Sequence, residues 1–273
     1  MEFVTTPDGT RLFVKDWGQG QPVILMHGWP LSADTWDFSA MAIAEAGFRA
    51  IAYDRRGFGR SSQPWEGYDY DTLSDDLAGV IEATGAANCV IVGFSMGGGE
   101  VARYMSRHRG EGVSKAALIS SIVPYMLKTD DNPNGVPSAV FDEMAKAMKD
   151  DRPKFFAEFF KTFYGVGVMS KPTSDEVVEW SCDVAMLSSL KATLGCANAF
   201  ATTDFRTDLP SFNVPTLIIH GTADNTVPID TSARPAAEGI PQAELIEYDG
   251  AAHGIFATDK ERLTEDLLRF LQQ

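Results

Sequence analysis

The chain has 273 residues, 44% of them hydrophobic and 22% charged, which suits one large globular domain or two small ones. Its formal net charge is −15, and so acidic a surface repels nucleic acid and anionic membranes. We expect a cytoplasmic protein, because no apolar run approaches the ~18 residues of a membrane helix and the N-terminus lacks a signal-peptide pattern. The spacing of Cys89, Cys182 and Cys196 fits neither a disulfide framework nor a zinc site, which predicts free thiols.

The first part of the chain alternates strands with helices. Residues 7–9 (PDG) suit the turn of an opening hairpin. Continuous apolar runs that end near glycine are typical of buried strands, and amphipathic stretches lie between them. We expect hairpin strands at 3–6 and 11–16, further strands at 22–27, 48–53, 89–93 and 116–121, and helices at 34–46, 70–84 and 96–107. This alternation predicts a mostly parallel, doubly wound sheet.

The alternation stops between about residue 124 and residue 209. That stretch looks helical, is rich in phenylalanine and shows no clear buried strand. Strands are expected again at 214–220 and 243–248, followed by a closing helix at 259–271. We therefore predict an α/β core of eight strands, formed by residues 1–123 and 210–273, with a helical cap at 124–209 inserted into it.

One motif with the pattern G-x-S-x-G lies at 93–97 (GFSMG), between a predicted strand and a predicted helix. Such a turn lifts the serine hydroxyl above the sheet, at the N-terminus of the helix. Asp224 and His253 each follow a late predicted strand, so the order is serine, acid, histidine. The pattern predicts Ser95 as nucleophile, His253 as general base and Asp224 as the acid that orients the base.

Other residues compete for these roles. Asp249 could replace Asp224, but it ends the same strand that leads to His253. Among the other histidines, His108 ends a charged helix and His220 lies at a strand end. Neither these residues nor the cysteines show metal-ligand spacing, and the glycines after the serine are not followed by the lysine of a phosphate loop, so no metal or phosphate site is predicted.

Acyl transfer through a serine needs two N–H donors aimed at the tetrahedral oxyanion. Met96 follows the nucleophile, and Trp29 lies in the segment 27–30 (HGWP) directly after a central strand. We predict that the backbone amides of Trp29 and Met96 form this oxyanion hole, while the His27 side chain ties the loop down. Pro30 fixes its own φ and biases Trp29 toward an extended backbone, so Pro30 is predicted to tune the loop.

The substrate pocket is expected where the cap faces the elbow. We predict a small apolar site that prefers acetyl-sized acyl groups and aryl alcohols. The alternative is that the cap phenylalanines only pack the cap against the sheet. The predicted walls, beside Trp29, are Phe94, Tyr125, Met144, Phe159, Phe163 and Val227.

Several long segments together resemble one family, the bacterial cofactor-free haloperoxidases and arylesterases of the α/β-hydrolase fold, with the related γ-lactamases. The segments are 27–31 (HGWPL), 53–61 (YDRRGFGRS), 68–72 (YDYDT), 93–99 (GFSMGGG), 163–165 (FYG) and 203–206 (TDFR). The resemblance implies the triad and oxyanion hole named above, a helical lid and no metal or organic cofactor. It also implies hydrolysis of small esters and, with hydrogen peroxide and a carboxylic acid, formation of peracids that oxidise halide. The segment 130–137 (DDNPNGVP) is similar to the γ-lactamase branch, which leaves the preferred substrate open.

Other functions on this fold remain alternatives. A haloalkane dehalogenase or epoxide hydrolase would carry aspartate at the nucleophile position, and Ser95 argues against both. A non-catalytic receptor for a small ligand can keep an intact triad, so the sequence leaves it open. The partners we expect are an ester, a lactam or a carboxylic acid with peroxide, and a homo-oligomer of this chain. Pro30 carries one further hypothesis: a Trp29 carbonyl aimed at the attack position could hydrogen-bond peroxide and favour it over water.

Overall fold

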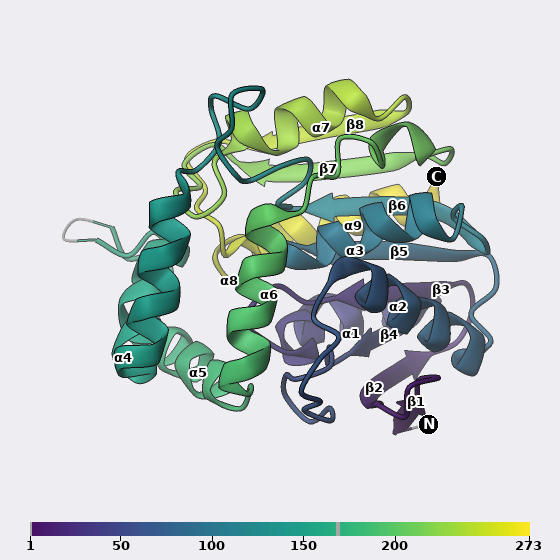
Figure 1. Ribbon diagram of the computed structural model, residues 1–273. Coiled ribbons are helices and arrows are strands. Elements are labelled where there is room, and N and C mark those ends of the chain that lie inside the picture. The colour runs from purple at the N-terminus through teal and green to yellow at the C-terminus, as the bar shows by residue number, and fades with distance from the viewer. Residues whose placement is uncertain (1, 168–169) are drawn as a thin grey trace.

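A computed structural model describes residues 2–167 and 170–273, and an eight-stranded sheet runs through its centre (Figure 1). The strands are β1 (Phe3–Thr5), β2 (Arg11–Gly18), β3 (Pro22–Met26), β4 (Arg49–Tyr53), β5 (Cys89–Phe94), β6 (Val113–Ile119), β7 (Thr216–Gly221) and β8 (Ala243–Tyr248). Their order is β1-β2-β4-β3-β5-β6-β7-β8. Only the β1–β2 and β2–β4 pairs are antiparallel. The predicted mostly parallel, doubly wound sheet is confirmed.

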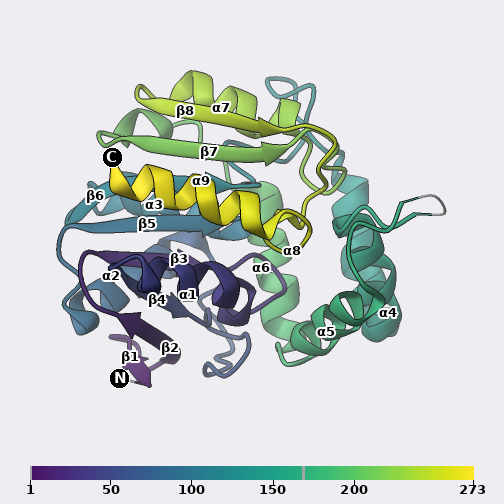
Figure 2. The same cartoon turned by 180° about the vertical axis from the view of Figure 1, so that it is seen from behind.

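Helices cover both faces of this sheet. The central strands β3, β5 and β7 are buried along their whole length, which explains their continuous apolar runs. In Figures 1 and 2, α1 (Asp37–Glu45) and α9 (Lys260–Gln272) lie on one face, and α2 (Tyr70–Thr84), α3 (Met96–Arg107) and α7 (Ala233–Gly239) lie on the other. Because these strands are parallel, their carboxyl ends lie at one edge of the sheet, where the loops after β5, β7 and β8 begin.

Local signals explain where the helices begin and end. Helix α2 matches the predicted range, since the Asp69 side chain accepts a hydrogen bond from the Thr72 amide and Gly85 ends the helix with a φ of 62°. The helix expected at 34–46 is instead a 3-10 turn, Ala33–Trp36, followed by α1. At the start of this 3-10 turn, the Ala33 amide donates a hydrogen bond to the buried Asp54 carboxylate.

The inserted segment supplies three helices that stand at the carboxyl edge of the sheet (Figure 1). They are α4 (Ser138–Phe163), α5 (Asp175–Met186) and α6 (Leu190–Thr202). Helix α4 is interrupted by non-helical backbone at Asp151, two residues before Pro153. Helix α6 lies between α4 and the sheet in both views (Figures 1 and 2). Residues 168 and 169 of the predicted cap fall outside the described residues.

Two short helices were not predicted from the sequence. Helix α7 and the four-residue α8 (Ile255–Thr258) were not predicted, because neither is long enough to show helical periodicity and α7 contains Pro235. Within the described residues, no single helix is long and apolar enough to cross a membrane. Two cap helices, α5 and α6, pass that test only as a pair bent by 103°.

Candidate active site

Ser95 occupies a strained turn between β5 and α3. Its φ of 54° and ψ of −117° lie outside the regions that most residues adopt. The turn requires glycine on either side: a Cβ at Gly93 would approach the Gly97 carbonyl oxygen to 2.3 Å, and one at Gly97 would approach the Met26 carbonyl oxygen to 2.7 Å. The backbone therefore presents the Ser95 hydroxyl at the N-terminus of α3, as the motif predicted.

The structure brings Ser95, His253 and Asp224 into one hydrogen-bonded chain. The His253 Nε2 atom lies 2.9 Å from Ser95 Oγ, and His253 Nδ1 lies 2.6 Å from Asp224 Oδ2. Because a carboxylate only accepts, Nδ1 carries the proton, which leaves Nε2 free to accept from the serine hydroxyl. All three side chains are buried, and they come from the loops that follow β5, β7 and β8.

Asp224 is surrounded by donors. Its Oδ1 accepts from the amides of Thr226 and Val227 at 2.9 and 2.7 Å, and its Oδ2 lies 3.2 Å from His220 Nε2. Burial raises the pKa of Asp224, but His253 and His220 outweigh it and hold the pKa below the ordinary aspartate range. His220 Nε2 also lies 2.8 Å from the Val227 carbonyl oxygen, so this nitrogen carries a proton that it shares with Asp224. The sequence had indicated only that His220 packs at a strand end.

Two backbone amides near Ser95 have no hydrogen-bond acceptor among the described residues. In the part of the chain that the structure describes, neither the Trp29 N–H nor the Met96 N–H donates to another protein atom. The Trp29 loop passes close to the nucleophile, since a Cβ at Gly28 would come within 3.0 Å of Ser95 Cβ. The Trp29 side chain is anchored to α6 by a 3.1 Å hydrogen bond from Nε1 to the Thr193 carbonyl oxygen. The peptide bond between Trp29 and Pro30 is cis.

A cavity of about 380 Å³ opens onto Ser95 and His253. Its walls come from the cap and from the loop after Asp224, and they are mostly apolar. The lining residues are Trp29, Ser95, Ile122, Met126, Val136, Val140, Phe141, Met144, Phe155, Glu158, Phe159, Thr162, Phe200, Asn225, Thr226, Val227, Pro228 and His253. The predicted wall residues Met144, Phe159 and Val227 lie in this lining.

Comparison with known proteins shows to which family the chain belongs. Residues 21–260 match the family described as alpha/beta hydrolase fold. The chain is 42% identical to a non-heme chloroperoxidase of Kitasatospora aureofaciens and 42% identical to a bifunctional esterase/perhydrolase of Acinetobacter calcoaceticus, each over 275 residues and 100% of both chains. A bromoperoxidase of Bacillus anthracis superposes with a TM-score of 0.96 at 42% identity, over 99% of each chain. The chain is an α/β hydrolase of the non-heme haloperoxidase and esterase family.

Three predicted pocket residues of this hydrolase lie outside the cavity lining. Phe94 and Phe163 are fully buried, and their rings pack against the His253 imidazole with centroid distances of 5.2 and 4.7 Å. Both rings therefore contact His253 and do not line the described cavity. The buried Tyr125 ring lies under the Arg206 guanidinium at 5.2 Å and is not among the lining residues. The prediction was wrong for these three, because position in the chain does not show which way a side chain points.

A buried ionic cluster beneath the elbow was missed by the sequence analysis. Arg55 Nε donates to Glu100 Oε1 at 2.6 Å, and Tyr53 donates its hydroxyl to Glu100 Oε2 at 2.6 Å. Arg55 also donates from Nη2 to the His27 carbonyl oxygen at 2.6 Å, and its amide donates to His27 Nε2 at 2.9 Å. Since Glu100 lies on α3 and His27 directly follows β3, the cluster joins α3 to the loop that contains Trp29.

The His27 ring forms hydrogen bonds that hold the loop containing Trp29. Its Nδ1 donates to the Gly28 carbonyl oxygen at 2.9 Å, because Nε2 is occupied by the Arg55 amide. Burial, with the Arg55 charge, holds the pKa of His27 well below its ordinary value. The imidazole is therefore neutral, in the tautomer that this hydrogen-bond pattern requires.

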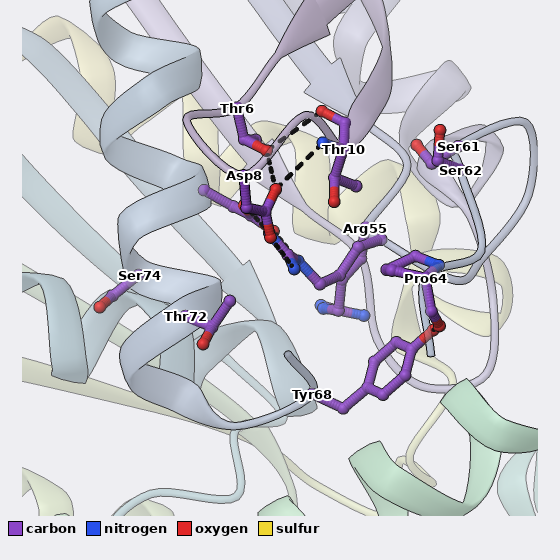
Figure 3. A network of polar contacts seen from close by, with 12 residues as sticks. Thr6, Asp8, Thr10, Arg55, Ser61, Ser62, Pro64, Tyr68, Thr72 and Ser74 are labelled. Carbon is purple, nitrogen blue, oxygen red and sulfur yellow. Dashed lines mark hydrogen bonds and ion pairs between the residues drawn. The ribbon is translucent and has the colours of Figure 1, made fainter. Parts of the chain in front are cut away.

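A second buried arginine, Arg56, fastens the opening hairpin to the core. It forms a two-pronged pair with Asp76 on α2, with both contacts at 2.6 Å, and it donates to Asp8 at 2.8 Å. Figure 3 shows how Asp8 at the tip of the hairpin also accepts from Thr6 and from the Thr10 amide, at 2.6 and 3.0 Å. This network lies away from the cavity and stabilises the edge of the sheet.

The polar groups of the cavity are few. Most of the lining is apolar, and its polar side chains belong to Ser95, Glu158, Thr162, Asn225, Thr226 and His253. Thr226 Oγ1 is buried and has no hydrogen-bond partner among the described residues, so a substrate atom could satisfy it. Across residues 2–167 and 170–273, no group of three or more histidine, cysteine, aspartate or glutamate side chains is placed to hold a metal ion.

Proposed function

We propose that this hydrolase cleaves small carboxylic esters through an acyl-enzyme on Ser95 and can pass the acyl group to water or to hydrogen peroxide. The observation that carries the proposal is the continuous hydrogen-bonded chain from Asp224 through His253 to Ser95, at the floor of an apolar cavity. Relatives named as esterase/perhydrolase and non-heme chloroperoxidase, at 42% identity over the whole chain, support the same activities.

Acylation begins when His253 Nε2 takes the Ser95 hydroxyl proton and Ser95 Oγ attacks the ester carbonyl carbon. The carbonyl oxygen becomes an oxyanion, which the free Trp29 and Met96 amides are placed to bind. His253 then gives its proton to the leaving alcohol as the carbon–oxygen bond breaks. Asp224 stays ionised throughout and stabilises the imidazolium.

Deacylation repeats these steps with a second nucleophile. When water attacks, His253 removes its proton, the bond to Ser95 Oγ breaks, and a carboxylic acid leaves. When hydrogen peroxide attacks instead, the product is a peracid, and the serine recovers its proton from His253. The free peracid then oxidises halide in solution, so halide needs no binding site on the protein.

A substrate panel on one preparation tests this proposal. We expect burst release of a chromogenic aryl alcohol from a short ester, steady turnover after the burst, and halide oxidation when acid and peroxide are supplied. A receptor that only binds would show no turnover. Activity should survive dialysis against a strong chelator, because the proposed steps use only side chains and backbone amides; a loss restored by added metal would contradict them.

Lactam hydrolysis stays a prediction that the same panel addresses. The segment 130–137, which resembles the γ-lactamase branch, contributes Val136 to the cavity wall and is tied down by an ion pair between Asp131 and Arg206. Its sequence can therefore influence which acyl groups fit. Bicyclic lactams belong in the panel beside esters.

Location and assembly are also proposed. The thiols of Cys89, Cys182 and Cys196 are free, which supports a reducing cytoplasmic location. Exposed apolar side chains such as Trp65 and Leu187 support a homo-oligomer, which light scattering on the purified protein would test.

A further inference from the structure

One charged residue of the cavity has no part in the proposed mechanism. Glu158 is the only acidic side chain in the described lining, and no lysine or arginine lines the cavity in the described part of the chain. The remaining walls are aliphatic, aromatic or neutral polar. A substrate in the cavity therefore faces one acidic side chain among the described lining residues and no lysine or arginine.

Glu158 is placed toward the cavity by helical spacing. Phe155, Phe159 and Thr162 also line the cavity, and positions three and four residues apart share one face of a helix. Lys154 and Lys161 lie about one turn away along α4. Neither lines the cavity, and within the described residues neither forms an ion pair or hydrogen bond with Glu158.

The surrounding walls reinforce the effect of this charge. Trp29, Phe141, Phe155, Phe159 and Phe200 all contribute to the lining, and aromatic faces attract organic cations. An anionic substrate group would lose its hydration without gaining a partner, which is costly in an apolar site. The net charge of −15 acts in the same direction by drawing cations toward the protein.

We propose that Glu158 makes this cavity selective for esters that carry an organic cation, such as a quaternary ammonium group, over neutral isosteres and, more strongly, over anionic esters. The inference rests on the proposed ester hydrolysis. Glu158 acts on the remote part of the substrate and leaves the chemistry at Ser95 unchanged. Its carboxylate is exposed at the cavity mouth, so the selectivity is modest and sensitive to salt.

The test uses esters that differ only in charge. Substituted ethyl acetates with a trimethylammonium, a tert-butyl or a sulfonate group form one series, and a second series carries the same groups on the acyl chain. The variants are Glu158→Gln and Glu158→Lys. Glu143→Gln is the matched control, because Glu143 is exposed on the same helix α4 but does not line the cavity.

We expect Glu158→Gln to lower the ratio of kcat/KM for the cationic ester to that for the neutral ester about threefold in at least one series, and Glu158→Lys to lower it about tenfold. The sulfonate ester should gain by similar factors. Glu143→Gln should leave the ratios unchanged, and ionic strength near 1 M, where the Debye length is about 3 Å, should shrink the difference.

The outcomes separate the two proposals. If the neutral tert-butyl ester is hydrolysed but the charge at residue 158 changes the ratio in neither series, the selectivity is overturned and ester hydrolysis stands. The same holds if Glu143→Gln shifts the ratios as much as Glu158→Gln, since the effect would then come from overall charge. If no ester of either series is hydrolysed by the unaltered protein, the proposed function itself fails.

Discussion

The cavity has two sides of different character. Its floor carries Ser95, His253 and Asp224 at the carboxyl edge of the sheet, and its roof is formed by the cap helices. On the floor, three groups are held by polar contacts: Asp224 receives four donors, His253 is bonded on both nitrogens, and the buried Arg55–Glu100 pair braces the turn at Ser95. On the roof, the cap contributes phenylalanine rings and Glu158, which has no ion-pair partner among the described residues. The sheet thus holds Ser95, His253 and Asp224 in one geometry, while the cap supplies much of the cavity wall. Variants of the floor should therefore affect rate and stability, and variants of the roof should affect substrate preference.

The largest effect should come from the nucleophile. Ser95→Ala should reduce kcat for ester hydrolysis by at least about a thousandfold, since removing a triad nucleophile costs several orders of magnitude. Steady-state rates with a short aryl ester measure this, and thermal unfolding serves as the control for folding. If the variant keeps more than about a tenth of the turnover, Ser95 is not the nucleophile.

The next effect concerns the brace beneath the elbow. Glu100→Gln leaves the buried Arg55 without its counter-charge, and we expect the free energy of unfolding to fall by about 3 kcal/mol. The exposed cap residue Glu143, changed to glutamine, should alter it by less than about 0.5 kcal/mol. Urea unfolding of both variants makes the comparison, and equal losses would show that the floor is no more constrained than the roof.

Substitution of His220 should change the pH dependence of kcat/KM. The pKa of Asp224 lies below its ordinary range, so this carboxylate stays charged in mild acid, and its contribution to stability is present above the usual aspartate range and lost only as pH falls through the lowered pKa. Asp224 therefore does not set the acid limb of kcat/KM. With His220→Leu, Asp224 loses one donor and holds the imidazolium more strongly. The acid limb should move up by about half to one pH unit, roughly the value of one hydrogen bond.

His220→Gln is the matched control for this shift. A glutamine keeps an N–H near the position of Nε2, so it should restore the acid limb toward that of the unaltered protein. If His220 had only a structural role, His220→Leu and His220→Gln would have the same pH profile and would lose only stability.

A smaller effect is expected from the roof. Phe159→Ala enlarges the cavity beside Trp29, whose ring centroid lies 5.4 Å from that of Phe159. KM for acetates should rise about three- to tenfold, because a partly buried aromatic contact contributes about 1 kcal/mol, and kcat should change little. Esters with longer acyl chains should be less affected. An equal loss of kcat for all chain lengths would mean that the cap also positions the reacting atoms.

The smallest effect concerns the choice between water and peroxide. If the Trp29 carbonyl accepts a hydrogen bond from hydrogen peroxide, Pro30→Leu should lower the ratio of perhydrolysis to hydrolysis about 2- to 10-fold, the value of one such bond. Both rates are measured on one ester. A ratio that changes by less than about twofold would leave Pro30 with a purely structural role.

The sequence predicted the floor far better than the roof. Ser95, Asp224 and His253 were found because each follows a strand in a fixed order, and a parallel sheet brings such strand ends together. Glu100 was missed because charged residues are surface residues by default; only its position one turn after the elbow, on a helix facing the sheet, could have drawn attention to it.

The roof could not be predicted in the same way. Its helices carry phenylalanine at several neighbouring positions, so periodicity does not show which ring faces the cavity. Phe159 does line it, whereas Phe163, one turn later on α4, packs against His253. That difference depends on how α4 packs against the core; Pro153 signals a break in the helix, but not the direction that the helix takes after it.

The proposed reaction proceeds through a covalent acyl group on Ser95. Rapid mixing of the protein with a chromogenic acetate ester, followed by acid quench and peptide mass spectrometry, tests it most directly. The account predicts a burst of alcohol of about one equivalent per subunit when deacylation is slower than acylation, together with an acetyl mass on the peptide that contains Ser95 and on no other. An acetyl group on a different residue, or turnover with no acylated species under any quench condition, would contradict it.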